Sequence, residues 1–374
     1  MATRKPENLD MFDLDIDKLS LETVEQREAI VRHYAENTDA IWFYSTSGGK
    51  DSDAGAVRLL ELVKDPRRIV FIHANLGVVE HPGILDHIKR YIPKESEFYV
   101  VENPKKDFID MVLLRGLFPS SQFRQCTSDL KVSQIDKIIK RVCRERGVKT
   151  CFNVTGLRSQ ESIPRSRRSP LVLNKRLTTK SRTCFDFLPV FHVREWAEEG
   201  SDELGVFDII AQAGRQPFHI YGVENIDGKA VRVRDGNSRT SCRFCILGNK
   251  QDLTNAANWY GSIATNGEHT DYEMMVALEE VVNHSMFFKT RTTTETIDGK
   301  KIKNREVIKV SLAEKTGVPV DEVAVRRWSM ILNERRQQLL EEKRIETEEK
   351  ATKKAEREAA KNAKFIDNKT IAMF

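Results

Sequence analysis

Short apolar runs alternate with helix-period segments through the first half of the chain. Almost wholly apolar runs occur at residues 40–44, 69–72, 98–101 and 150–154. Around and between them, apolar residues recur at helical spacing over residues 22–37, 53–63, 84–91, 108–114 and 133–146. Strands that are apolar on both faces are typical of a parallel sheet covered by helices on each side. The pattern therefore predicts an α/β fold with a doubly wound, mostly parallel sheet and a helical C-terminal extension.

The rest of the chain follows other patterns. Residues 158–182 are rich in Arg, Lys, Ser and Thr and lack a period, which predicts a long loop. Residues 286–310 predict a β-hairpin that turns at Asp298-Gly299. Residues 333–364 are highly charged, which fits either a solvated helix or a disordered tail. We expect four parts: an N-terminal helical segment (1–38), a main domain (39–260), a small α/β accessory region (261–332) and a charged tail (333–374).

Composition changes this picture little. Of the 374 residues, 40% are hydrophobic and 31% are charged, and the formal net charge of +5 permits an anionic partner without demanding one. No apolar run approaches the roughly 18 residues that span a bilayer. Residues 1–10 are polar, unlike a signal peptide. We expect a cytoplasmic protein without a membrane partner.

The first apolar run leads into the segment with the clearest chemistry. The strand ends at Ser45, and Ser47-Gly48-Gly49-Lys50-Asp51-Ser52 follows before a helix. Glycines let backbone N–H groups turn toward one point, and the positive end of the following helix attracts a phosphate chain. Lys50 can neutralise phosphate oxygens, Asp51 can hold Mg²⁺, and the serine hydroxyls can donate hydrogen bonds. A Walker A loop is excluded, because Tyr44 stands where that loop needs a glycine.

This loop resembles the PP-loop of the N-type ATP pyrophosphatases and their relatives. These enzymes split ATP between its α- and β-phosphates, or hold a sulfonucleotide on the same loop. Further segments resemble the PAPS reductase family in the same order along residues 41–250: His73-Ala74-Asn75-Leu76-Gly77 with Glu80, residues 126–131, residues 156–162 and residues 239–245. Asn75 and Leu76 replace the pair usual in that family.

The resemblance implies an adenine nucleotide alpha hydrolase-like fold of the HUP type. It also implies an adenine-nucleotide ligand, either ATP or a sulfonucleotide (PAPS or APS), with Mg²⁺. Nucleotide contacts are then expected from Ser45, Ser47, Gly48, Gly49, Lys50, Asp51, Ser52, Asn75, Gly77, Gly156 and Arg158. Among these, Arg158 is expected to meet the anionic group of the nucleotide.

The six cysteines give a second candidate site. Cys242 and Cys245 have a chelate spacing that is found in iron–sulfur, zinc and redox sites. Cys126 stands where iron–sulfur members of the resembled superfamily have a further ligand, so the resemblance implies a [4Fe–4S] cluster. Cys184 is the best candidate for its fourth ligand, and a substrate atom or a missing ligand are the alternatives. Zinc and no metal also remain open. Cys143 and Cys151 fit core positions.

One departure from the family directs the functional expectation. PAPS reductases carry their reducing thiol in a C-terminal Glu-Cys-Gly-Leu-His-type segment, whereas this chain has no cysteine after Cys245. We therefore expect ATP-dependent adenylation and sulfur transfer, with Lys50, Asp51 and Arg158 as catalytic residues. The expected partner is a sulfur donor or a thiol reductant, and DNA or tRNA modification fits as a destination. A PAPS or APS reductase using an external thiol and a non-catalytic nucleotide- or DNA-binding regulator are the alternatives.

Two further segments give weaker predictions. The arginines and lysines of residues 158–182 fit either a solvated loop or a clamp for sulfate, pyrophosphate or nucleic-acid phosphates. Residues 311–330 weakly resemble a helix-turn-helix, a pattern that also arises in plain helical packing. A true helix-turn-helix would direct the enzyme to DNA.

Overall fold

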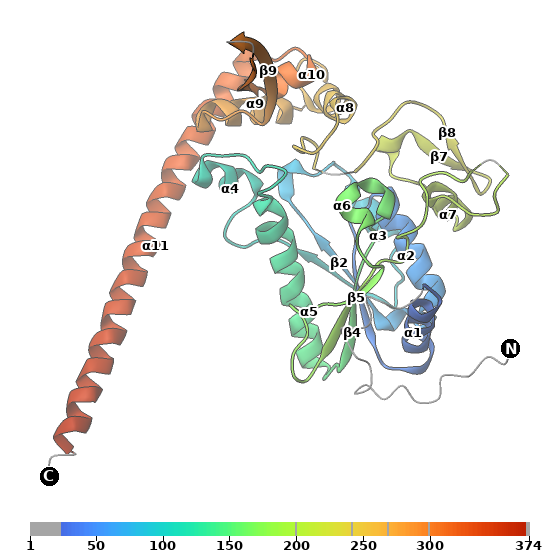
Figure 1. Ribbon diagram of the computed structural model, residues 1–374, viewed down its shortest axis with the longest axis horizontal. Helices are drawn as coiled ribbons and strands as arrows, with labels where there is room; N and C mark the ends of the chain where they lie inside the picture. The colour runs from blue at the N-terminus through green and yellow to red at the C-terminus, as the bar shows by residue number, and fades with distance from the viewer. Residues whose placement is uncertain (1–23, 199, 241, 268, 298–299, 372–374) are drawn as a thin grey trace. The chain divides into compact units, whose positions relative to one another are not determined.

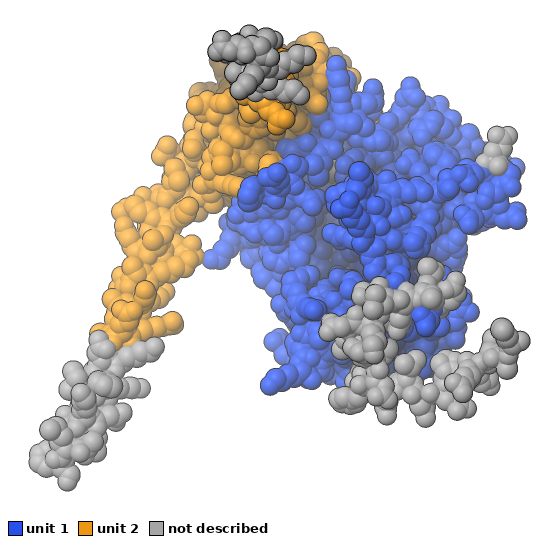
Figure 2. Space-filling view, viewed as in Figure 1, with its two compact units in different colours: residues 1–107, 121–256 blue, residues 108–120, 257–374 orange. Residues whose placement is uncertain are grey.

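The computed structural model describes residues 24–198, 200–240, 242–267, 269–297 and 300–371. The chain divides into two compact units, which Figure 2 shows in different colours. Unit 1 comprises residues 1–107 and 121–256, and unit 2 comprises residues 108–120 and 257–374. Most of the predicted N-terminal helical segment lies outside the described residues. No helix of the described chain is both long and apolar enough to cross a membrane.

Unit 1 is built on a six-stranded sheet in the order β3-β2-β1-β4-β6-β5 (Figure 1). The strands are β1 (Ile41–Ser45), β2 (Ile69–Ala74), β3 (Glu97–Val101), β4 (Thr150–Thr155), β5 (Leu171–Leu173) and β6 (Thr183–Phe187). Neighbouring strands are parallel except for β5, which runs antiparallel to β6 at the edge. The predicted doubly wound, mostly parallel sheet is confirmed.

Helices cover both faces of this sheet, which explains why the strand runs are apolar throughout. On one face, α1 (Val24–Asn37) and α2 (Lys50–Leu62) pack over Trp42, whose ring stacks on Phe152 with centroids 3.9 Å apart. On the other face, α5 (Ser133–Glu145) buries Ile139 and Cys143. The remaining elements of unit 1 are η1 (Pro66–Arg68), η2 (Gly77–Val79), α3 (Ile84–Arg90), η3 (Cys126–Val132), η4 (Ser159–Glu161), α6 (Ile163–Ser166), α7 (Val206–Gln212), η5 (His219–Tyr221), β7 (Val223–Ile226) and β8 (Lys229–Arg232). α8 (Lys250–Tyr260) continues across the division into unit 2.

Unit 2 is helical with a β-hairpin. Its elements are α4 (Phe108–Arg115), α9 (Asp271–Val282), β9 (Phe287–Ile297), β10 (Lys300–Val310), α10 (Leu312–Thr316) and α11 (Glu322–Ile371). α11 buries Val325, Leu332 and Leu339, seven residues apart, and Arg335 on this helix pairs with Asp110 of α4 at 2.8 Å. Beyond residue 340 the described side chains of α11 are exposed through residue 359.

The four predictions for these regions have different outcomes in the structure. The hairpin is present, although its predicted turn at residues 298–299 lies outside the described residues. The tail is the helical alternative, because α11 runs to Ile371. The segment expected as one loop, 158–182, instead holds η4, α6 and β5. In the region of the weak helix-turn-helix, the first helix, α10, has only five residues, and its DNA-binding role stays a prediction.

Candidate nucleotide site

The site lies where the strand order of unit 1 reverses. From β1 the chain proceeds to β2 and β3 on one side, and it returns to place β4 on the other side of β1. Open α/β sheets bind ligands in the crevice at the carboxyl ends of the strands at such a point. The loop after β1, which contains residues 46–49, and the loop after β4, which begins at Gly156, meet there. Gly156 approaches so closely that a Cβ atom on it would lie 2.2 Å from the Asp51 carbonyl oxygen.

The loop after β1 has the backbone that its glycines predict. Gly48 adopts a φ of +67°. Gly49 is the N-cap residue of α2, and because it has no side chain it does not cap the helix with a hydrogen bond. The Ser47 N–H donates to the Ser52 Oγ at 3.0 Å, which closes the loop over the first turn of the helix. Ser45 ends β1 at the same edge. This arrangement presents the positive end of a 13-residue helix at the crevice, where it favours an anion.

Lys50 is buried in this site, with 3% of its surface exposed. Its Nζ donates to the Ser238 carbonyl oxygen at 2.6 Å and lies 3.7 Å from the Glu195 carboxylate. The ammonium also lies 5.1 Å from the ring centroid of Tyr221. The hydroxyl of Tyr221 accepts the backbone N–H of Lys50 at 3.0 Å. A buried ammonium is stable only with such partners, so its head group is fixed at the start of α2.

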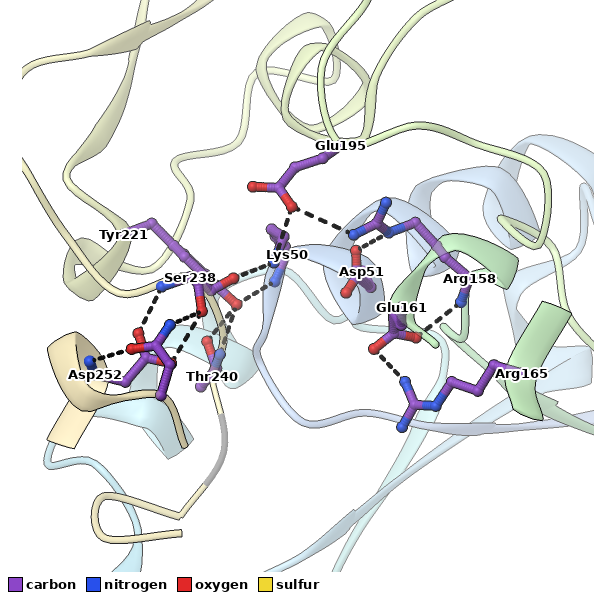
Figure 3. A network of polar contacts seen from close by, with 11 residues as sticks. Lys50, Asp51, Arg158, Glu161, Arg165, Glu195, Tyr221, Ser238, Thr240 and Asp252 are labelled. Atoms are coloured by element: carbon purple, nitrogen blue, oxygen red, sulfur yellow. Dashed lines mark hydrogen bonds and ion pairs between the residues drawn. The ribbon is translucent and has the colours of Figure 1, made fainter. Parts of the chain in front are cut away.

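Arg158 brings the loop after β4 to the same point, as Figure 3 shows. Its Nε donates to Asp51 Oδ1 at 2.5 Å, and its Nη2 lies 3.5 Å from Glu195. Glu161 orients this loop, because it accepts the Arg158 N–H at 3.0 Å and pairs with Arg165. The structure thus joins the three predicted catalytic residues, Lys50, Asp51 and Arg158, in one network.

The electrostatics of the network are set by burial. Removal from water raises the pKa of Asp51, and this effect outweighs the opposing attraction of Lys50 and Arg158. One Asp51 oxygen already accepts from Arg158, and Asp51 is the only acidic residue on the phosphate loop itself. A divalent cation at this carboxylate would take its other ligands from phosphate oxygens and water, which is the usual coordination of Mg²⁺ with a nucleotide.

Four residues of the site were not expected from the sequence: Glu195, Tyr221, Ser238 and Thr240. Thr240 stands in residues 239–245, and Tyr221 stands in a further segment, Pro217 with Tyr221-Gly222, that also resembles the PAPS reductase family; this resemblance was the available signal. Glu195 lies in an irregular segment after β6, and Ser238 contributes a backbone carbonyl. Neither the hydrophobic pattern nor a motif marks these two positions.

Polar side chains at the end of β2 hold this edge of the site together. The Asn75 side chain donates to Glu102 at 2.5 Å and accepts the Gly77 N–H at 3.0 Å, so it joins the turn after β2 to the residue that follows β3. His73 instead connects this edge to the phosphate loop, with Nδ1 3.1 Å from the Thr46 carbonyl oxygen and Nε2 3.0 Å from Glu80. Nucleotide contacts from Asn75 and Gly77 stay predictions.

Three of the predicted cysteine ligands lie near one another. The Cys245 N–H donates to the Cys242 carbonyl at 3.1 Å, and the Leu247 N–H approaches the Cys245 sulfur at 3.5 Å. Cys126 begins the π-helical segment η3. Burial raises the pKa of Cys126, and the neighbouring Cys245 raises it further. Burial likewise raises the pKa of Cys242, with smaller contributions from Cys245 and Cys126.

Cys184 lies elsewhere, in the core of the sheet. It is fully buried in β6, directly opposite Cys151 of β4. Among the described residues, no group of three or more His, Cys, Asp or Glu side chains is arranged to hold a metal ion. The [4Fe–4S] cluster and zinc stay predictions.

Of the basic segment, Arg158 contacts Asp51 and Glu195 directly, and Arg165 joins the network through Glu161. Arg176 pairs with Asp136 of α5, and Arg182 donates to the Leu177 carbonyl oxygen at 2.8 Å. The side chains of Arg176 and Arg182 are therefore bonded to other residues of the fold. The phosphate clamp expected from this segment stays a prediction for its other members.

Comparisons with known proteins add little. No family model and no curated protein matches the chain. Among solved structures, it is similar to an FMN adenylyltransferase from Candida glabrata, with 13% identity and a TM-score of 0.32 over 51% of this chain and 56% of that one. It is also similar to a phosphoadenylyl-sulfate (PAPS) reductase from Candida auris in a phosphate complex, with 14% identity and a TM-score of 0.33 over 60% of this chain and 99% of that one. The chain thus spans just over half the length of the adenylyltransferase, and scores this low do not bear on its activity.

Proposed function

We propose that unit 1 is a nucleotide-binding enzyme of the PP-loop type. It holds the phosphate chain of ATP or of a sulfonucleotide on residues 47–52. The observation that carries this proposal is the convergence of Lys50, Asp51 and Arg158 at the β1/β4 switch point, with Arg158 2.5 Å from Asp51 and both cations almost fully buried. Fixed cations at a helix N-terminus are suited to the negative charge of a phosphate chain.

The reaction that this arrangement fits best is adenylation. A nucleophilic oxygen of the acceptor attacks the α-phosphorus of ATP, and the bond from that phosphorus to the bridging oxygen breaks. Pyrophosphate leaves with the bonding electron pair, so negative charge accumulates beside the phosphate loop. Lys50 and Arg158 stabilise that charge in a site with little access to water. Asp51 would hold the Mg²⁺ of the nucleotide, which would further neutralise the phosphates.

Sulfur transfer is the proposed purpose of the activation. A hydrosulfide from the sulfur donor attacks the acceptor atom that bears the adenylate, the bond from that atom to the adenylate oxygen breaks, and AMP leaves with the electron pair while the acceptor keeps the sulfur. The sequence resemblance to sulfur-handling relatives and the neighbouring Cys126, Cys242 and Cys245 support this choice. The second candidate is reduction of PAPS or APS by an external thiol, which the order of the family-like segments favours.

The test measures binding and turnover with the same preparation. Calorimetry with ATP, PAPS and APS, each with Mg²⁺, gives the preferred ligand. Pyrophosphate release from ATP supports adenylation, whereas release of sulfite from PAPS with thioredoxin present supports the reductase. Nucleotide binding that requires Lys50, without either product, identifies a non-catalytic regulator. Failure of all three nucleotides to bind contradicts the proposal.

The predicted cluster has a separate test. Iron and acid-labile sulfide are measured in anaerobically purified protein, together with its visible absorption. Retention of iron in Cys184→Ala and its loss in Cys242→Ser would show that the iron is held by the partly exposed cysteines Cys126, Cys242 and Cys245 and not by Cys184. A colourless, iron-free protein contradicts the cluster.

A further inference from the structure

The hairpin of unit 2 is a long ribbon with little cover. β9 and β10 each have 11 residues and pair in register from Phe287↔Val310 to Ile297↔Lys300. They form a two-stranded sheet of their own, and the described side chains at residues 288–294 and 304–307 are exposed. An isolated two-stranded ribbon is marginally stable in water. Its length therefore calls for an explanation other than the packing of a core.

The two faces of the ribbon differ in charge. Paired residues of an antiparallel ribbon share a face, and successive residues alternate between faces. One face, which we name the threonine–lysine face, has Lys301, Lys303, Arg305, Val307 and Lys309 on β10. Their partners on β9 are Thr296, Thr294, Thr292, Thr290 and Phe288. None of the residues that the register places on this face is acidic.

The opposite face carries mixed charge and the packed base. Its basic residues are Lys289, Arg291 and Lys300, and its acidic residues are Glu295 and Glu306. Arg291 lies 3.9 Å from Glu306, its direct cross-strand partner. At the base of this face Phe287, Ile308 and Val310 are partly buried. The threonine–lysine face is therefore the side whose charged residues all have one sign, and its described side chains, including Arg305 and Lys309, are exposed.

Protection against aggregation does not account for this separation. Lysines on exposed strands discourage pairing with other chains, and threonine is a common strand residue. Lysines on either face would provide that protection. The placement of four basic residues on one face and of both acidic strand residues on the other requires a further reason, and a polyanionic partner supplies one.

We propose that the threonine–lysine face binds the phosphate backbone of double-stranded DNA, with the ribbon lying in the major groove. Alternate strand residues are about 6.8 Å apart, so the register places the basic positions 301, 303 and 305 at regular spacing along one face of β10. Lys, Arg and Thr side chains commonly donate to phosphate oxygens. The major groove of B-DNA, roughly 12 Å wide, admits a two-stranded ribbon, whereas the major groove of A-form RNA is deep and narrow.

The test is fluorescence anisotropy of a labelled 20-base-pair DNA duplex titrated with the full chain at several salt concentrations. We expect the triple variant Lys301→Gln, Lys303→Gln, Arg305→Gln to bind at least ~10-fold more weakly at low salt. Its slope of log affinity against log salt should be smaller by about 3, since three phosphate contacts are removed. The matched control is Lys289→Gln, Arg291→Gln, Lys300→Gln, which removes the same charge from the opposite face and should bind within about twofold of the unmodified protein.

Four outcomes overturn the proposal. They are no duplex binding by the full chain at low salt, equal weakening by both triple variants, tighter binding to an RNA duplex of the same sequence, and tighter binding to vesicles of anionic lipid. Circular dichroism and thermal unfolding confirm that each variant is folded. The inference does not rest on the proposed nucleotide chemistry, because the ribbon variants should keep nucleotide binding while Lys50→Ala keeps DNA binding.

Discussion

At the scale of single residues, the candidate site balances two buried cations against two carboxylates. Lys50 and Arg158 face Asp51, which is mostly buried, and Glu195, whose side chain is 38% exposed. A phosphate chain brings several negative charges to the same cations. Glu195 is held by two contacts of 3.5 and 3.7 Å and is the more accessible carboxylate, so it is the one that can move aside.

Glu195→Gln should therefore strengthen nucleotide binding. The substitution removes a charge that competes with phosphate for Lys50 and Arg158, while it keeps the size of the side chain. Because the carboxylate is partly exposed, its ion pairs are worth at most about 1 kcal/mol, which predicts a Kd lower by roughly two- to fivefold. Calorimetry checks this, with Glu198→Gln in the same segment as control. Weaker binding would show that Glu195 contacts the ligand or its metal instead.

Gly156→Ala should damage the junction between the two loops. A Cβ atom there would lie 2.2 Å from the Asp51 carbonyl oxygen and 2.7 Å from Ser52 Cα, and backbone atoms cannot give way cheaply. Overpacking of this kind costs about 1–3 kcal/mol of unfolding free energy. The control is Gly147→Ala, where a φ of +63° strains the backbone but no atom lies within 4 Å. If both variants bind nucleotide equally well, the close approach has no role in the site.

Some of these site residues could be predicted from the sequence, and Glu195 could not. Lys50, Arg158 and Gly156 could be predicted because each stands in a short motif beside an apolar strand. Glu195 could not, because the irregular segment that carries it has no period and folds back onto the site only in three dimensions.

At the scale of elements, the strands with the clearest patterns were predictable and the edge was not. β1 and β2 are buried on both faces, so each reads as an apolar run. β5 has three residues and lies at the sheet edge, which leaves too little hydrophobic signal to separate it from a loop. α2 begins at Lys50, earlier than its apolar period indicated, because its first turn is formed by the polar phosphate loop.

Glu279 of α9 gives unit 2 a predicted dependence on pH. Its carboxylate accepts the Met286 N–H at 2.5 Å and the Leu312 N–H at 2.9 Å, which ties α9 to the chain just before β9 and to the start of α10. Burial raises the pKa of Glu279 from 4.5 to about 7. Between these two values the folded state binds more protons than the unfolded state, so the unfolding free energy falls as pH rises from about 4.5 to 7.

Glu279→Gln should flatten that dependence. The amide oxygen can still accept a backbone N–H, but the side chain no longer ionises in the buried site. The melting temperature of unit 2, followed at several pH values between 5 and 8, checks this. Glu280→Gln changes the exposed neighbour and should leave the slope in place. An unchanged slope in Glu279→Gln would assign the pH dependence to other groups.

At the scale of the whole molecule, the fold separates the six cysteines into two groups. Cys126, Cys242 and Cys245 are partly exposed, whereas Cys143, Cys151 and Cys184 are buried in the core. The chelate spacing identified two members of the first group. The position of Cys184 depends on the strand order, which its sequence neighbourhood does not encode.

Alkylation of the metal-free, reduced protein should therefore modify three thiols. Cys126, Cys242 and Cys245 should react with iodoacetamide under native conditions, slowly at neutral pH because the pKa values of Cys126 and Cys242 are raised. The three core thiols should react only after unfolding. Mass spectrometry of the digested protein assigns each modified residue. Native labelling of Cys184 at a comparable rate would contradict its place in the core.

The division into two units was also beyond the sequence pattern. Residues 108–120 continue the helix–strand alternation of the main domain, yet they belong to unit 2, where α4 packs with α9 and α11. Local periodicity identifies an apolar helix face but not the partner that covers it. The predicted α/β class, by contrast, required only the order and type of elements.

The most direct test of the central claim is nucleotide binding by the Lys50→Ala variant. Calorimetry with the preferred nucleotide and Mg²⁺ compares it with the unmodified protein and with Lys64→Ala, an exposed lysine just past the other end of α2. Loss of a buried charge contact costs about 2 kcal/mol or more, so we expect the Kd of Lys50→Ala to rise roughly 30-fold or more, with Lys64→Ala unchanged. Unaltered nucleotide binding by a folded Lys50→Ala protein would contradict the assignment of residues 47–52 as the phosphate site.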